Sequence, residues 1–110
     1  MKNNEYLALP VEGNQLGLTT ISKLAVETIA ATAVLELENV KLLEKTNFRN
    51  PVICRIVDNA LTLSVDIRIN YNSNIDDVCL LVQKKINQVL SQTIELTCKE
   101  IDVRVVGFIF

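Results

Sequence analysis

Histidine is missing from this 110-residue chain, and glycine occurs only three times, at positions 13, 17 and 107. Histidine is the commonest general base and a frequent metal ligand, so its absence disfavours most hydrolytic and metal-dependent chemistry. So few glycines leave no Walker phosphate loop, no GxGxxG fingerprint and no GXXG clamp, and the sequence also lacks GxSxG. We therefore expect a protein that is not an enzyme, with no catalytic residues, no cofactor and no metal site.

Aromatic and clustered basic residues are also scarce. Aromatic residues make up 5% of the chain, the net charge is -2 and the pI is about 5.1. Lys84-Lys85 is the one adjacent pair of basic residues. Nucleic-acid surfaces combine basic patches with aromatic stacking platforms. The composition therefore predicts no nucleic-acid partner.

Long apolar runs are absent as well. A membrane-spanning helix needs roughly 18 or more apolar residues in succession, and no segment of the sequence approaches that length. Met1-Lys2 is followed by NNEYLALP, which is not the apolar core of a signal peptide. We expect a cytoplasmic protein that does not insert directly into a membrane.

The three cysteines, Cys54, Cys79 and Cys98, are odd in number and far apart, which disfavours a disulfide framework and a CxxC motif. Without a histidine partner, each is better interpreted as a small apolar residue than as a nucleophile. Asp76-Asp77 could bind a cation, but two carboxylates at a helix start more often complement the helix dipole.

What the chain does contain is the material for one folded domain, with 49% hydrophobic and 22% charged residues. We interpret residues 1–13 as a flexible N-terminal leader and residues 14–110 as a single domain. A short strand is predicted over 14–19. A helix follows, with Ser22 as its N-cap and Asn39 as a C-terminal cap. Its predicted core face, at helical spacing, comprises Ala25, Val26, Ile29, Ala30, Ala33, Leu37 and Val40.

The second half of the chain has clear strand signals. After a polar connection over 41–51, residues 52–57 read as a strand, and Asp58-Asn59-Ala60 reads as a hairpin turn. Residues 61–71 alternate strictly between apolar and polar types, which predicts a strand with one dry face. The second helix is predicted to begin near Asp76, and its predicted core positions are Val78, Val82, Ile86, Val89 and Thr93.

A last strand is predicted over 100–108. The predicted fold class is α/β, a two-layer sandwich in the order (β)αββαβ, with two helices packed on one face of a small mixed sheet. Ferredoxin-like arrangements share this element order, but the sequence does not fix the order of the strands.

The first helix carries a second apolar stripe, formed by Leu24, Ala31 and Leu35. Isolated exposed leucines are common, so the stripe alone is compatible with an ordinary surface. A nearly all-apolar helix is more typical of a covered one, and a surface apolar patch often marks an interface. The cover could be the C-terminal VVGFIF with Phe108 and Phe110, or a second copy of the protein. These five residues form the predicted interaction surface.

The segment GLTTISKLAVETIAATAVLELENV resembles the opening motif of the alkaline-shock protein family of Gram-positive bacteria, and the resemblance extends over residues 14–108. The family's entry motif and following helix are matched at Gly17, Ile21, Ser22, Val26, Ile29, Ala30 and Ala33. The strand ending at Tyr71, the pair Val82-Gln83 and the closing IDVRVVGF also resemble family segments. The chain departs from the family at two turns, with Glu38-Asn39 in place of Pro-Gly and Asn72 in place of Gly.

The resemblance implies a non-enzymatic structural or interaction protein of the envelope stress response. It implies a homo-oligomer, or a protein held beneath the membrane by a membrane-anchored partner. Two other classes stay open on the element order alone. One is a small RNA-binding module, for which the acidic pI is unfavourable, and the other is a regulatory subunit of a metabolic enzyme.

Overall fold

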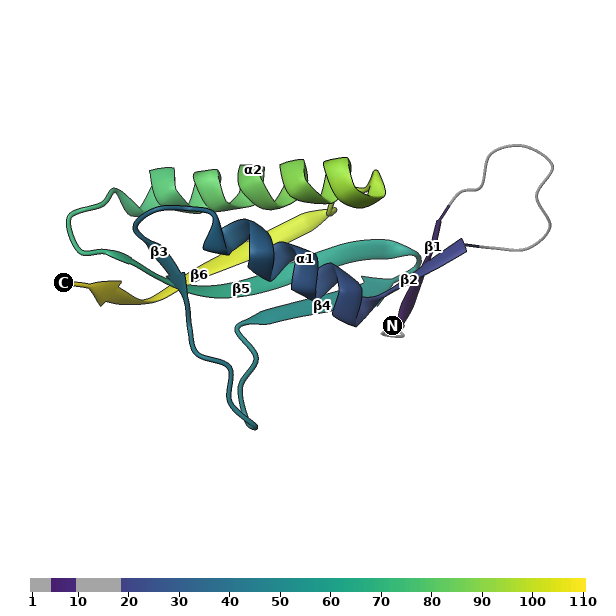
Figure 1. The fold of residues 1–110 in the computed structure, drawn as a ribbon, viewed down its shortest axis with the longest axis horizontal. Coiled ribbons are helices and arrows are strands. Elements are labelled where there is room, and N and C mark those ends of the chain that lie inside the picture. The colour runs from purple at the N-terminus through teal and green to yellow at the C-terminus, as the bar shows by residue number, and fades with distance from the viewer. Residues whose placement is uncertain (1–4, 10–18) are drawn as a thin grey trace.

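Figure 1 shows the computed structural model, which describes residues 5–9 and 19–110. Two helices lie on one face of a mixed sheet, so the predicted two-layer α/β architecture is confirmed. The elements in chain order are β1 (Tyr6–Leu9), β2 (Thr19–Ser22), α1 (Lys23–Leu35), β3 (Val40–Leu42), β4 (Val52–Val57), β5 (Ala60–Asn70), α2 (Ile75–Ile94) and β6 (Glu100–Ile109).

Strand β5 is the centre of the main sheet. β6 runs parallel to it from Thr62 to Asn70, along one edge. β4 and β3 are antiparallel to β5 and pair with its first and last parts, over 60–65 and 67–69. Because a strand has two edges and β6 occupies one, β3 and β4 lie end to end along the other. The sheet is therefore three strands wide, and residues 43–51 leave it between β3 and β4.

Strand β3 corrects the prediction that residues 41–51 form only a polar connection. Its three residues pair with the end of β5, with Val40 opposite Ile69 and Leu42 opposite Ile67. β5 has eleven residues and β4 has six, so the last part of β5 would otherwise lack a partner on this edge.

The predicted leader also contains a strand. β1 is antiparallel to β2, with Leu7 opposite Ile21, and the Leu7 side chain is buried in the core. The side-chain amide of Asn59 holds β1 from the other side: Ala8 N donates to its Oδ1 at 2.8 Å, and its Nδ2 donates to Ala8 O at 3.1 Å. Of the strand predicted over 14–19, residues 14–18 lie outside the described residues, and β2 begins at Thr19.

Helix α1 begins as predicted. Ser22 is extended, and its Oγ accepts from Ala25 N at 3.1 Å, which satisfies one free amide of the first turn. The helix ends at Leu35, four residues before the predicted cap at Asn39. Asn39 instead has a φ of 62° in the turn that leads into β3, a conformation that asparagine tolerates better than most residues.

The hairpin between β4 and β5 is confirmed. Val57 pairs with Ala60, and the two residues between them, Asp58 and Asn59, have φ values of 50° and 58°. These are the left-handed angles of a type I′ turn, whose twist matches that of the flanking strands.

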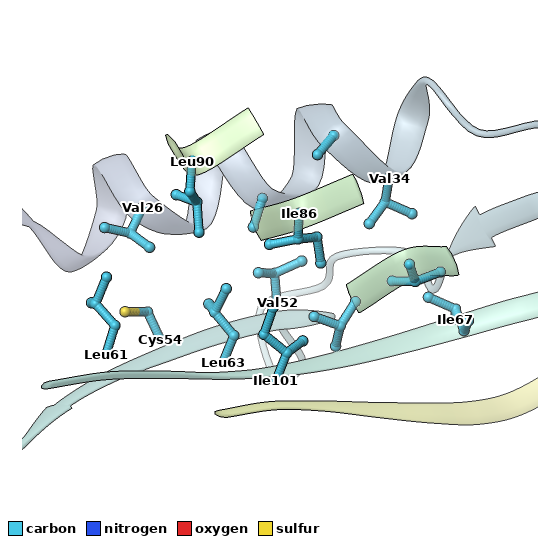
Figure 2. Close-up of a cluster of buried hydrophobic side chains, with 14 of the residues drawn as sticks. Val26, Val34, Val52, Cys54, Leu61, Leu63, Ile67, Ile86, Leu90 and Ile101 are labelled. Carbon is cyan, nitrogen blue, oxygen red and sulfur yellow. The ribbon is translucent and has the colours of Figure 1, made fainter. Parts of the chain in front are cut away.

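Helix α2 is capped by Asn74, whose Oδ1 accepts from Asp77 N at 3.1 Å. Its buried side chains are Val82, Ile86 and Leu90, whereas Thr93, predicted to be in the core, is exposed. Figure 2 shows where the layers meet, with Ile86 and Leu90 directed toward the side chains of the sheet. The sheet contributes Val52, Cys54, Ile56, Leu61, Leu63, Val65, Ile67, Ile69 and Ile101, and α1 contributes Val26, Ala30, Ala33 and Val34.

Candidate docking surface

The outer face of α1 carries the exposed leucines that the sequence singles out. Leu24 is 66% exposed and Leu35 is 71% exposed, and Ala31 between them is partly buried. The face is not purely apolar, because Thr28 lies on it, with its hydroxyl donating to Leu24 O at 2.8 Å. Val34, which the sequence places at the edge of this stripe, is instead fully buried.

A groove of about 250 Å³ runs beside this face, between α1 and the segment that joins β3 to β4. Leu24 and Ala31 form its helical wall, and Leu35 is not part of it. The groove is lined by Leu24, Glu27, Thr28, Ala31, Leu42, Leu43, Lys45, Asn50, Pro51 and Val52. Its lining is mostly apolar, which suits the side chains of another protein better than a charged small molecule.

Residues 43–51, here called the arm, project from the sheet edge (Figure 1). The arm turns back on itself at Thr46 and Arg49, whose backbones exchange hydrogen bonds of 2.8 and 3.3 Å. Phe48 lies in this turn with its side chain fully exposed, at 100%. Burying an aromatic side chain yields a large hydrophobic gain, so a projecting phenylalanine is a natural contact point for a partner.

Sequence analysis missed Phe48. The residue stands alone in a polar stretch, TNFRN, where no apolar periodicity marks it. A single phenylalanine in a predicted connection was the available signal.

Asp66 ties the base of the arm to the sheet. Its carboxylate is 4% exposed and lies between two guanidinium groups, with Arg104 Nε 2.7 Å from Oδ1 and Arg49 Nη2 3.3 Å from Oδ2. The contact at Oδ1 is ionic, because no described donor is aligned with that oxygen as a hydrogen bond. Its backbone also joins both ends of the arm: Leu43 N donates to Asp66 O, and Asp66 N donates to Pro51 O.

The C-terminal aromatic residues lie elsewhere. Phe108 is opposite Ile69 in the β5–β6 pair, and Phe110 is 95% exposed and stacks on Tyr71, with ring centroids 5.5 Å apart. β6 is on the sheet edge opposite β4, which α1 contacts. The C-terminal segment is therefore a sheet strand and leaves Leu24 and Leu35 exposed. The five predicted residues fall on two separate surfaces, one at α1 and one at the end of β6.

The uncovered face of the sheet holds a second concavity, of about 320 Å³. Its polar lining mixes two basic, two acidic and two hydroxyl side chains: Arg55, Arg104, Glu100, Asp102, Thr62 and Ser64. Because the two signs of charge are interspersed, this surface has no single charge that would select an anion or a cation.

The thiols are poor nucleophiles in this fold. Burial, assisted by the nearby Glu27 carboxylate, raises the pKa of Cys54 to about 11. Burial and the neighbouring Cys54 raise the pKa of Cys98 to about 12, and burial with Asp76 raises the pKa of Cys79. All three are therefore protonated at neutral pH, and the thiolate is the reactive form.

Within residues 5–9 and 19–110, no group of three or more cysteine or acidic side chains is arranged to hold a metal ion. No helix in the same part of the chain is both long and apolar enough to cross a membrane.

Comparison with known proteins identifies one family. The model of the alkaline-shock protein family, which is described as having a cell envelope-related function, matches residues 11–110. YqhY of Bacillus subtilis (strain 168), itself described as uncharacterized, is 28% identical over 123 aligned positions, which cover the whole chain and 90% of YqhY. No solved structure matches the chain significantly.

Proposed function

Because the chain belongs to the alkaline-shock protein family, whose function is related to the cell envelope, we propose that it is a non-catalytic docking protein of the envelope stress response. In this proposal the protein works in the cytoplasm, beneath the membrane, by holding an exposed segment of a membrane-anchored protein. Alkaline stress is the condition that the sequence resemblance suggests.

The observation that carries the proposal is the groove beside α1. Leu24 leaves most of its side chain in water on one wall, and Phe48 projects fully exposed from the arm that forms the other wall. An apolar segment laid in the groove would cover both side chains. At about 25 cal/mol per Å² of apolar surface removed from water, burial of two such side chains contributes a few kcal/mol, near the scale of an interface hot spot.

Binding rather than catalysis is supported by the chemistry available. The chain contains no histidine, and the cysteine thiols have raised pKa values. The 320 Å³ concavity on the open face of the sheet has side chains of both charges and no aligned pair of acid and base. A partner would be recognised by shape and apolar contact at α1.

The test is fractionation of the tagged chain from its host into membrane pellet and supernatant, before and after alkaline stress. We expect the wild type in the membrane pellet, and expect Leu24→Asp and Phe48→Asp to move into the supernatant while keeping their circular dichroism spectra. Leu81→Asp is the matched control, because Leu81 is half-exposed on α2 and does not line the groove. A wild type found in the supernatant under both conditions would refute the proposal, and so would variants that stay with the membrane.

A further inference from the structure

The two edges of the main sheet differ in how they meet water. On β4, Val52 N donates to the side chain of Asn50 at 3.0 Å, and Cys54 N donates to the Glu27 carboxylate at 2.7 Å, so side chains block that edge. On β6, no strand of the described chain pairs with the outer edge. An unpaired edge of this length is a template for another strand. The fold therefore closes one edge and leaves the other open.

The outward backbone groups of β6 can be identified. Gln83 of α2 donates its side-chain amide to Ile101 O at 3.0 Å, which marks Ile101 as an outward residue. Backbone groups of successive strand residues point to alternate edges, so Val103 and Val105 also present theirs outward. A carbonyl oxygen has two lone pairs, so Ile101 can accept from Gln83 and from a neighbouring strand together.

We propose that the outer edge of β6 pairs antiparallel with β6 of a second copy of this chain, about a two-fold axis at Val103. In this register Asp102 lies opposite Arg104 of the second copy, and Arg104 lies opposite its Asp102. Both pairs are on the uncovered face of the sheet. On the helix-covered face, Ile101 lies opposite Val105 of the second copy, so charge meets opposite charge and apolar meets apolar.

Neighbouring registers lack this complementarity. An axis at Asp102 sets two aspartates opposite each other, and an axis at Arg104 sets two arginines opposite each other; like charges directly across a ladder are destabilising. A shift by half this step sets valines of the covered face against charges of the open face. Arg104 contacts Asp66 of its own chain through Nε, which leaves its terminal nitrogens to face the second copy.

Helix α2 supports the same axis. It runs opposite to β6 and above it (Figure 1). Lys85, in an ion pair of 3.0 Å with Glu36, marks the side of α2 that faces α1, and Gln83 marks the side that reaches the outer edge of β6. Leu80, about one helical turn before Gln83 on that outer side, is half-exposed. Across the axis it would meet α2 of the second copy, and packed helices lie about 8–10 Å apart.

This pairing uses neither the groove beside α1 nor the arm, so it stands or falls independently of the proposed function. The test is sedimentation velocity of the purified chain over a concentration series. We expect the wild type to reach twice the chain mass of 12.3 kDa. Asp102→Arg turns both attractions into repulsions, and we expect the dimer dissociation constant to rise about 10- to 100-fold. Val103→Pro removes the amide at the axis, which an edge strand tolerates when that amide faces outward.

Glu38→Arg is the control, since it makes the same change of charge at an exposed position between α1 and β3. Both test variants should be monomers with native circular dichroism, and Glu38→Arg should remain a dimer. If Val103→Pro fails to fold, Asp102→Arg decides the question, because the Asp102 side chain is exposed. A monomeric wild type would mean that α2 keeps a second strand away and would overturn the proposal. A dimer unchanged by Asp102→Arg, or one that Glu38→Arg also dissociates, would overturn it as well.

Discussion

Removing the Glu27 carboxylate should destabilise the fold by exposing the edge of β4. Glu27 Oε2 accepts from Cys54 N at 2.7 Å, and this bond joins the middle of α1 to the outer edge of a strand 27 positions later. A hydrogen bond to a charged group contributes about 1.5–3 kcal/mol net. Because the site is only part-buried, water can replace some of the lost bond, and we place Glu27→Ala at about 2 kcal/mol.

The measurement is equilibrium urea unfolding, with Glu38→Ala as the control for loss of an acidic side chain at an exposed position. Glu27→Gln keeps an acceptor oxygen, so it should lose about half as much as Glu27→Ala. Amide exchange should locate the effect, since the Cys54 amide is released in Glu27→Ala. The reasoning fails if Glu27→Ala unfolds within about 0.5 kcal/mol of the control, the range of ordinary surface substitutions.

Three further predictions test the core, the thiols and the first strand. Leu90→Ala should lower the free energy of unfolding by about 2–5 kcal/mol, whereas Leu81→Ala on the half-exposed side of the same helix should lower it by less than about 1 kcal/mol; urea unfolding of both decides, and equal losses would contradict the assigned core. Because the pKa of Cys54 is about 11 in the fold and 9.0 in a free thiol, the unfolded chain ionises first as pH rises from 9 to 11, so stability is lost over that window at up to about 1.4 kcal/mol per pH unit. Cys54→Ala should lack this share of the alkaline loss, and parallel slopes for the two proteins would refute it. Asn59→Gly keeps the positive φ but loses both hydrogen bonds to Ala8, so amide exchange across β1 should speed up while the β4–β5 hairpin stays protected.

The elements that sequence analysis identified are those whose signals are local. The hairpin follows from strict alternation beside two residues that tolerate left-handed angles, Asp58 and Asn59. The start of α1 follows from Ser22, whose hydroxyl serves its own first turn. In both cases the residues that form the structure are neighbours in the chain.

The elements that were missed depend on distant partners. β1 has four residues, and its place is fixed by Ile21 and by the side chain of Asn59, far along the chain. β3 has three residues and exists because the central strand extends beyond β4. No local periodicity reports either requirement.

The predicted interaction surface was half informative for the same reason. Helical spacing identified Leu24 and Leu35 as exposed, which the structure bears out. The opposite wall of the groove and the exposed Phe48 depend on how residues 43–51 leave the sheet, and that path is set by pairing with β5. A helix pattern cannot carry that information.

The geometry separates the two proposed surfaces. The groove lies by α1 and the edge closed by Glu27, and the open edge of β6 lies across the sheet. Two chains joined along β6 would therefore turn their grooves away from each other, and a single dimer could hold two membrane-anchored segments. If so, Leu24→Asp should release the protein from the membrane without changing its mass in solution. Asp102→Arg should halve that mass yet leave each groove able to bind, and a variant that lost both properties at once would show that the surfaces are one.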